Sequence, residues 1–481
     1  MKTFFLTSVL IFLFGSFAMA QSIPHDSLYF GQTPPGKTPK LFAPGKVSLP
    51  GRNEAVITFS PDGTSMFFYI EKYPQPGIPY TMYATYTNNH WTTPDTIPFS
   101  NGRSTGEPFF AYNGNRIYMF ATNAVNHIGI MDLSYSEKQG NNWSDPISLG
   151  NPPNSEAYQY HPCIVGDTSI YFSSYAGYIC RCQYNNGNYQ NRIILPRPIN
   201  YISSPTWGDP YVSSDEKYMI LKSIREEGYG QNDIYISYKK TDGSWTNPKN
   251  LGNIINTPND ETSGDITPDG LYMTYGSNKD LWWVSASFID SLKYTNYRPY
   301  VKNPIPDQTA TVGQWFNFTI PDSTFMDDDG NNTLTYNAKL SNGDPLPGWL
   351  TFDSIAETFT GTPDAIQILN IKVTATDTAG ASATTPLKIR VTLETSIDSV
   401  NRQRESVKIF PNPTSGTVNV SLDVFSDEMA IVEIRNLVGE CLLKNRFKKS
   451  ITLNLADKPK GLYILKLQIG NEIIVRKVVI K

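Results

Sequence analysis

A turn-and-strand pattern that returns five times in the first three hundred residues constrains the fold more than any other feature. Its two fullest copies are residues 60–63 and 267–270, which read Ser-Pro-Asp-Gly and Thr-Pro-Asp-Gly, each followed by an apolar run. Degenerate copies lie at positions 113, 166 and 215, so the position of Asp62 recurs after 51, 53, 49 and 54 residues. A fixed pattern with a period near fifty residues is typical of repeat architectures.

Each repeat reads as four short antiparallel strands, the last of which begins near an aromatic residue such as Trp91, Trp143 or Trp245. Four strands cannot bury a core alone, but sheets that are stacked radially cover one another. The fifth repeat lacks an aromatic fourth strand, and residues 44–50, around Val47, resemble the end of one. The sequence therefore predicts a five-bladed β-propeller over residues 42–300, with this N-terminal strand completing the fifth blade.

The Pro-Asp turns resemble the WD40-like Pro-Asp repeats of TolB-type β-propellers, and the resemblance covers residues 42–300. It implies the fold and leaves the activity open, because this fold hosts binding proteins, peptidase accessory domains and glycosidases. The composition also indicates a turn-rich β protein, with 17% charged and 13% aromatic residues, 34 Gly and 35 Pro. The predicted class is all-β, a five-bladed β-propeller followed by two Ig-like β-sandwich domains.

Residues 1–20 have the pattern of a signal peptide, with Lys2 before an apolar run and Ala-Met-Ala at 18–20. Cleavage is expected between Ala20 and Gln21, and residues 21–41 read as a linker. No other segment approaches the length of a transmembrane helix, so none is expected in the mature chain. The net charge of −4 gives no attraction to nucleic acid, and no such partner is predicted.

Residues 301–393 show the strand alternation of a β-sandwich, and three stretches carry a resemblance. Residues 325–332 read Phe-Met-Asp-Asp-Asp-Gly-Asn-Asn, residues 346–350 Leu-Pro-Gly-Trp-Leu, and residues 359–363 Phe-Thr-Gly-Thr-Pro. Their order resembles the cadherin-like, dystroglycan-type Ig-fold modules of bacterial surface proteins. Alternating oxygen side chains suit a calcium loop, so the candidate ligands are Asp327, Asp329, Asn331 and Asp377. The alternative is a solvated acidic turn, and no other cofactor is predicted.

Residues 405–481, after a polar linker at 394–404, form a third unit with 12 Lys and Arg against 8 Asp and Glu. It opens with Pro-Asn-Pro at 411–413 and carries Gly-Leu-Tyr at 461–463. This ordered set resembles the type A C-terminal sorting domain of the type IX secretion system of Bacteroidetes. The resemblance implies that the secretion machinery is a partner and that the protein is secreted or held at the outer cell surface.

Acidic residues precede the repeated turns and form the candidates for catalysis: Glu54, Glu107, Asp209 and Glu261, with Asp265 and His161 nearby. The innermost strand of each blade lines the central channel of a propeller, so some of these side chains could converge there, as the two carboxylates of a glycosidase must. The alternative is that each of them caps a turn, once per blade. The chain has no HExxH and no GxSxG motif, so we expect a binding protein, with a surface glycoside hydrolase as the alternative.

Aromatic residues near the loops of the third and fourth repeats are the candidates for binding a glycan or protein ligand: Tyr160, Tyr175, Tyr178 and Trp207. Such rings stack on sugars or anchor a protein partner, and their alternative role is packing between blades. Cys163, Cys180 and Cys182 are either small buried residues or, in an oxidising compartment, a disulfide from Cys163 to one of the pair.

Overall fold

The computed structural model describes residues 23–71, 79–100, 102–140, 142–166, 168–200, 208–393, 407–422, 429–470 and 472–481. The expected signal peptide, its cleavage site at Ala20 and Gln21, and Trp207 lie outside these residues. Within them, no helix has the length and apolar character needed to cross a membrane. The chain folds into two compact units, one holding the described residues up to 304 with 321–337 and 374–385, and the other holding 305–320, 338–373 and the residues from 386 onward.

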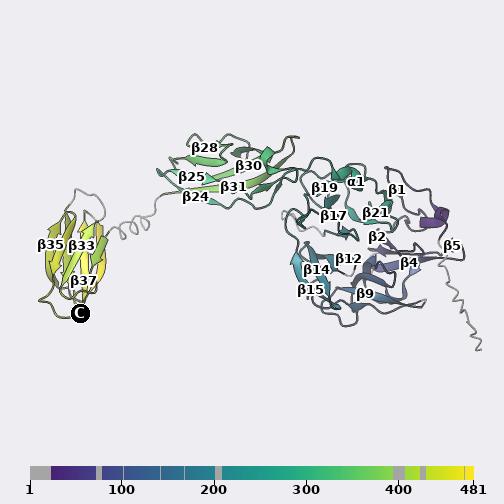
Figure 1. Ribbon diagram of the computed structural model, residues 1–481, viewed down its shortest axis with the longest axis horizontal. Helices are drawn as coiled ribbons and strands as arrows, with labels where there is room; N and C mark the ends of the chain where they lie inside the picture. Colours follow the sequence, from purple (N-terminus) through teal and green to yellow (C-terminus); the bar gives the residue numbers. More distant parts are fainter. Residues whose placement is uncertain are drawn as a thin grey trace, which may run out of the picture. The chain divides into compact units, whose positions relative to one another are not determined.

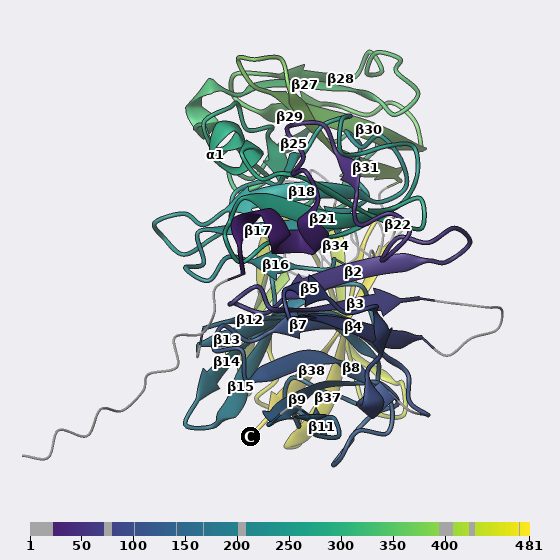
Figure 2. The same cartoon turned by 90° about the vertical axis from the view of Figure 1, so that its right-hand side faces the viewer.

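The first unit contains five antiparallel sheets of four or five strands, each built from consecutive strands except that β1 of the N-terminal segment joins the fifth (Figure 1). The first strand of each sheet contacts the first strand of the next, and β20 returns to contact β2. Figure 2 shows β2, β3 and β4 of the first sheet side by side in that order.

The strands of the five sheets have the following bounds. The first two sheets are β2 (Glu54–Phe59), β3 (Ser65–Ile70), β4 (Tyr80–Thr87), β5 (His90–Trp91) and β6 (Asp95–Thr96), then β7 (Thr105–Phe110), β8 (Arg116–Ala121), β9 (Asp132–Gln139), β10 (Asn142–Trp143) and β11 (Ile147–Ser148). The other three are β12 (Gln159–Val165), β13 (Ser169–Ser174), β14 (Ile179–Asn185) and β15 (Asn188–Ile194), then β16 (Tyr211–Val212), β17 (Tyr218–Ser223), β18 (Asp233–Tyr238) and β19 (Lys249–Asn250), then β20 (Glu261–Ile266), β21 (Tyr272–Ser277), β22 (Asp280–Ser285) and β1 (Lys40–Leu41).

The repeated turn has the same hydrogen bonds at Asp62, Asp215 and Asp269. Asp62 Oδ1 accepts from the Ser60 hydroxyl at 2.6 Å and from the Thr64 amide at 3.0 Å. Asp269 Oδ1 accepts in the same way from the Thr267 hydroxyl at 2.6 Å and from the Leu271 amide at 3.0 Å. Gly63 takes a φ of 71° in the first of these turns, a conformation that favours glycine. This local chemistry sets the sharp reversal between the first two strands of a repeat.

The N-terminal segment completes the fifth sheet through β1, in which Lys40 lies opposite Trp283 and Leu41 opposite Trp282. The expectation of such a strand is right, but its placement around Val47 is wrong. Residues 43–48 instead form a tight turn, in which the Val47 amide donates to Ala43 O at 2.9 Å. The Val47 side chain is fully buried in the core beside this turn. This burial explains why residues 44–50 resemble the end of a strand in the sequence.

Part of the predicted linker at 21–41 is also corrected, because residues 25–41 pack on the fifth and first sheets. The η1 segment (His25–Gly31) places the Tyr29 ring 5.1 Å from Phe59 and 5.9 Å from Trp283. Trp91 Nε1 donates to Ser27 O at 2.9 Å. The folded region therefore begins before the predicted boundary at 42.

The disulfide alternative is wrong, since Cys163, Cys180 and Cys182 are all free and buried. The Val212 amide donates to Cys163 Sγ at 3.1 Å, and burial raises the pKa of the Cys163 thiol. These residues act as small core side chains, which is the other interpretation of the pattern.

The segment after the fifth sheet forms α1 (Phe288–Lys293), and an Ig-like sandwich follows. Its strands are β23 (Tyr300–Val301), β24 (Gln308–Thr311), β25 (Phe316–Thr319), β26 (Phe325–Met326), β27 (Thr335–Leu340), β28 (Leu350–Asp353), β29 (Thr358–Gly361), β30 (Gln367–Thr376) and β31 (Ser382–Thr392). One sheet has the order β24-β31-β30-β27 and the other β25-β29-β28. Burial alternates along β30 and β31, so each strand turns one face to the core.

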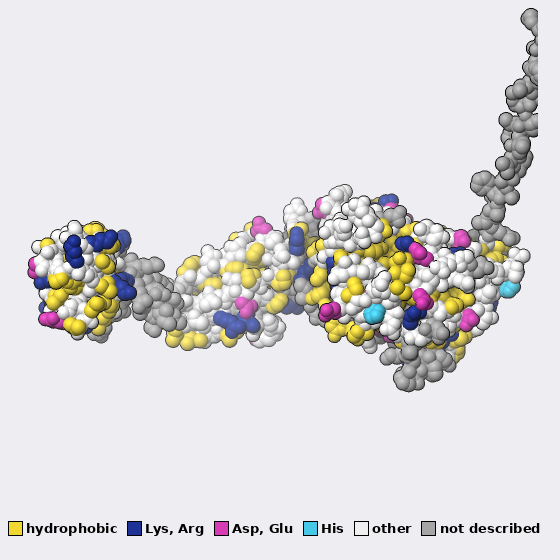
Figure 3. All heavy atoms as spheres, turned by 90° about the horizontal axis from the view of Figure 1, so that it is seen from below, with side chains coloured by type: hydrophobic (Ala, Val, Ile, Leu, Met, Phe, Trp, Pro, Cys, Tyr) yellow, Lys and Arg dark blue, Asp and Glu magenta, His cyan; other side chains and the backbone are white. Residues whose placement is uncertain are grey.

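The C-terminal domain is a second sandwich, with sheets ordered β32-β33-β36 and β35-β34-β37-β38. Val418, Val432, Leu465 and Val478 are fully buried between them. In Figure 3, Lys and Arg side chains gather on the surface of this domain, in line with its excess of basic residues. The strands are β32 (Val407–Phe410), β33 (Thr417–Leu422), β34 (Ala430–Arg435), β35 (Cys441–Phe447), β36 (Ser450–Asn454), β37 (Gly461–Ile469) and β38 (Glu472–Ile480).

We expect the stability of β34 to depend on Glu433 at neutral pH. Glu433 pairs with Lys444 at 2.9 Å and with Arg435 at 2.6 Å, and hydrogen bonds from these two residues lower its pKa from 4.5 to about 2. The contribution is complete above about pH 4.5 and is lost as the pH falls toward 2. Hydrogen exchange of β34 should therefore be faster in Glu433→Gln at pH 7, with the difference fading at low pH, whereas Glu440→Gln should match the wild type. Equal protection at pH 7 would contradict this role.

Candidate functional site

Three of the five sheets carry an ionisable residue before a proline at the same position of the repeat. Glu107, His161 and Asp209 precede Pro108, Pro162 and Pro210, and their φ angles are 52°, 49° and 37°. The register of β7 and β12 shifts at this point, as expected for a β-bulge. A bulge re-aims a side chain, and non-glycine residues at positive φ cost energy that the surrounding structure must supply.

The bulges bring these three side chains together. One ligand atom from each of Glu107, His161 and Asp209 lies within 4.8 Å of the other two. Glu107 Oε2 accepts from the His161 amide at 2.7 Å, and Lys222 Nζ lies 2.6 Å from Asp209 Oδ2. His161 Nε2 lies 3.9 Å from Asp265 Oδ1. We call these five residues the polar cluster.

Burial and neighbouring charges shift the pKa values of Glu107, His161 and Lys222 in the polar cluster. Burial raises the pKa of Glu107 to about 7, and the charge of Asp209 adds to this effect against the opposing effects of His161 and Lys222. Burial alone would lower the pKa of His161, but the carboxylates of Asp265, Asp209 and Glu107 raise it overall. Burial also opposes the charge of Lys222, and Asp209 outweighs it, so the pKa of Lys222 rises. Opposite charges within the cluster therefore outweigh the cost of burial for His161 and Lys222.

Glu54 and Glu261, the other two acidic candidates, lie outside the polar cluster and support loops. Glu54 Oε1 pairs with Arg52 at 2.5 Å and accepts from the Leu49 amide at 3.3 Å. Glu261 accepts from the Thr257 amide at 3.0 Å and from the Ser277 hydroxyl at 2.8 Å. The structure therefore separates the four candidates into two that converge and two that cap local turns.

Lys222 was missed from the sequence, although a signal was present. It lies in β17 among Met219, Ile220 and Leu221, which are all buried. A lysine in a strand of buried residues needs a partner, because an unpaired buried charge is costly.

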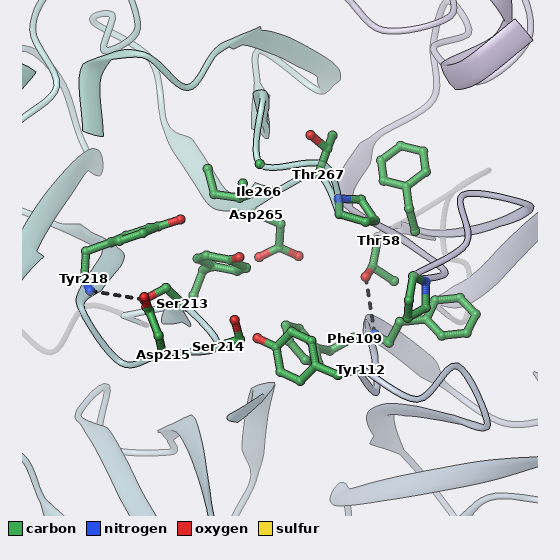
Figure 4. A pocket seen from close by; sticks show the side chains of 16 residues that line it. Thr58, Phe109, Tyr112, Ser213, Ser214, Asp215, Tyr218, Asp265, Ile266 and Thr267 are labelled. Carbon is green, nitrogen blue, oxygen red and sulfur yellow. Dashed lines mark hydrogen bonds between the residues drawn. The ribbon is translucent and has the colours of Figure 1, made fainter. Parts of the chain in front are cut away.

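A cavity of about 370 Å³ opens where β2, β7, β16 and β20 end. Its walls are mainly aromatic and hydroxyl side chains with one buried acid, Asp265, that points into it (Figure 4). Burial raises the pKa of Tyr112 and of Tyr211, so both phenols stay protonated and can donate hydrogen bonds. Asp265 also contacts His161, so it joins the cavity to the polar cluster. The lining includes Thr58, Phe59, Pro61, Phe109, Phe110, Tyr112, Tyr211, Ser213, Ser214, Asp215, Tyr218, Asp265 and Thr267.

Of the aromatic residues chosen from the sequence, the three that the structure describes, Tyr160, Tyr175 and Tyr178, do not line this cavity. Tyr160 is the second residue of β12, and its ring lies 6.2 Å from that of Tyr158, which lies 5.7 Å from that of Tyr175. Tyr175 is 59% exposed, and Tyr178 is half-buried. Tyr160 lies near the start of β12 and Tyr175 directly after β13, whereas most of the cavity residues lie at the ends of first strands or in the turns that follow them. Tyr112, Tyr211 and Tyr218 were not singled out, although each lies within a few residues of a repeated turn.

The predicted calcium ligands lie together in the first unit, with several oxygens already bonded. Asn331 Oδ1 accepts from the Asp327 amide at 2.7 Å, Asp329 Oδ2 from the Tyr297 amide at 2.6 Å, and Asp377 Oδ2 from Asn296 Nδ2 at 2.9 Å. Asp327 Oδ2 is buried without a hydrogen-bond partner. Burial raises the pKa of Asp327, and nearby carboxylates, including that of Asp329, raise it further.

Comparison with known proteins decides the role of the C-terminal domain. A family model described as "Secretion system C-terminal sorting domain" matches residues 408–481. Residues 408–481 are a type IX secretion sorting domain. The protein is therefore directed to the outer cell surface, and the type IX secretion machinery is a partner, as the resemblance implied. A second model, described as "Putative Ig domain", matches residues 298–392 of this secreted protein and confirms the Ig-like domain.

Other similarities are more distant. The secreted protein is 30% identical over 148 residues to the serine-rich adhesin for platelets of Staphylococcus aureus, a match over 31% of this chain and 6% of the adhesin. A gluconolactonase from Xanthomonas campestris is 12% identical over 45% of this chain and 67% of its own, with a TM-score of 0.27. Latent PorU from Porphyromonas gingivalis is 10% identical over 89% of this chain and 33% of its own, with a TM-score of 0.16.

Proposed function

We propose that the protein is a surface-displayed binding protein whose five sheets form a five-bladed β-propeller and whose cavity binds a small glycan. The continuous series of contacts between first strands supports the propeller. The cavity carries the binding proposal, because it combines Tyr112, Tyr211 and Tyr218 with the carboxylate of Asp265. Aromatic faces pack on sugar rings, a carboxylate accepts from sugar hydroxyls, and the volume is within the range of small-molecule sites. The Ig-like domain, cadherin-like in this proposal, serves as a spacer.

Binding is favoured over glycoside hydrolysis by the position of the paired carboxylates. A glycosidase needs both carboxylates against the scissile bond. Glu107 and Asp209 do not line the cavity, and Asp209 is 3% exposed and paired with Lys222. The hydrolase alternative predicts release of reducing sugar that is lost in Glu107→Gln, and that result would replace the binding proposal.

Glycans that bind the full chain on an array should bind Asp265→Asn about ten-fold or more weakly in calorimetry, because a hydrogen bond to a charged group contributes about 1.5–3 kcal/mol. Glu261→Gln is the matched control, since Glu261 is a buried acid of the same strand outside the cavity. It should leave the affinity unchanged. An array without any bound glycan, or equal affinity in Asp265→Asn, would contradict the proposed site.

We also propose calcium at the acidic loop, supported by Asp327 Oδ2, which is buried without a partner among carboxylates. Calcium at 10 mM should stabilise the first unit by about 1.4–2.7 kcal/mol, if its affinity is that of extracellular modules. Asp327→Asn should remove the shift in melting temperature, and Asp353→Asn, in an exposed turn, should retain it. Absence of any shift at millimolar calcium would rule the site out.

A further inference from the structure

The polar cluster contains a set of atoms that its own hydrogen bonds do not explain. Asp209 Oδ1 is buried without a hydrogen-bond partner, and the Asp209 side chain is 4% exposed. A buried carboxylate oxygen that lacks a partner is costly, and its presence in a folded protein calls for a cation or a hydrogen-bond donor. This oxygen belongs to one of three residues whose ligand atoms lie within 4.8 Å of one another.

Each of the three residues is also held by a second group. The His161 amide donates to Glu107 Oε2 at 2.7 Å, and Lys222 binds Asp209 Oδ2 at 2.6 Å. Asp265 faces Nε2 of His161 at 3.9 Å. Metal ligands in proteins are oriented by outer partners of this kind.

The formal charges of the polar cluster are suited to a divalent cation. Glu107, Asp209 and Asp265 are three carboxylates, and Lys222 neutralises one of them. With all three carboxylates ionised and the His161 imidazole neutral, which is the protonation state that metal binding requires, the cluster carries two negative charges. A divalent ion would balance them.

We propose that Glu107, His161 and Asp209 bind one divalent transition-metal ion, with zinc as the best fit. Calcium and magnesium prefer oxygen ligands alone, whereas an imidazole with carboxylates suits zinc and its first-row neighbours. Three protein ligands from three different sheets leave a further coordination position free. The ion would tie these sheets together, and the inference does not depend on the ligand of the cavity.

The test is metal binding by the full chain after dialysis against a chelator. The experiment uses a Cys441→Ser background, because Cys441 is an exposed free thiol that could hold metal on its own. Elemental analysis after zinc loading should find about one equivalent per chain, the content of a single mononuclear site. Cobalt should give visible absorption bands that zinc abolishes. Binding that stays substoichiometric for both ions would overturn the proposal without the need for any variant.

Variants assign the site to these residues. Glu107→Gln, His161→Gln and Asp209→Asn should each lose the cobalt bands, while Glu261→Gln should keep them. Asp265→Asn should weaken zinc binding about 10–100-fold, as outer partners do. Circular dichroism of the metal-free proteins shows which variants are folded. A folded His161→Gln protein with wild-type zinc affinity would overturn the assignment, and no result with glycans bears on it.

Discussion

Replacement of Lys222 by methionine is expected to destabilise the first unit by about 3–5 kcal/mol, because it leaves a buried carboxylate without its partner. Lys222 Nζ lies 2.6 Å from Asp209 Oδ2, with side-chain exposures of 10% and 4%. Burial keeps water from replacing the lost ammonium. Guanidinium unfolding of the metal-free full chain, followed by tryptophan fluorescence, measures the change, since six of the eight tryptophans lie between positions 91 and 283.

Lys217→Met provides a matched control from the same region of the fold. Lys217 pairs with Asp215 at 2.7 Å, but the two side chains are 76% and 49% exposed. Exposed ion pairs contribute little, so this variant should unfold like the wild type. The double variant Asp209→Asn with Lys222→Met should be more stable than Lys222→Met alone, because it removes the uncompensated charge. Equal stability of Lys222→Met and Lys217→Met would show that burial of the pair has no energetic consequence.

Replacement of Phe42 by alanine is expected to cost about 3–5 kcal/mol, as for large buried aromatic residues elsewhere. Phe42 is fully buried directly after β1, and its ring lies 5.4 Å from that of Trp283 in the fifth sheet and 5.9 Å from that of Phe59 in the first. Loss of the Phe42 ring would therefore weaken the packing of the first and fifth sheets together. The expected result is a single unfolding transition of the first unit, moved to lower denaturant.

Leu271→Ala is the control for Phe42→Ala. Leu271 is 50% exposed after the turn of the fifth sheet, so its removal should change stability by no more than about 0.5 kcal/mol. A Phe42→Ala protein as stable as Leu271→Ala would mean that the N-terminal segment does not hold the first and fifth sheets together.

The site was partly predictable because one of its signals is local. Glu107 and Asp209 were chosen from their place before the repeated turns, and the dipeptides Glu-Pro, His-Pro and Asp-Pro at 107, 161 and 209 recur in register. Glu54 and Glu261 are also acids near the start of a strand, and although no proline follows them, this difference alone does not show which acids converge. Only the bulges, which turn three side chains to one point, and the loop contacts of the other two distinguish the groups.

The sequence by itself determined the five repeats, most of the strands within them and the C-terminal sorting domain, because turns and alternation depend on neighbours along the chain. Tertiary structure decided which residues complete the fifth sheet, since both Val47 and Leu41 are apolar and only pairing with Trp282 selects Leu41. It likewise decided that Lys222, His161 and Asp265 meet Glu107 and Asp209. Those contacts join different sheets, and no local pattern encodes the distance between residues that the closing of the fold brings together.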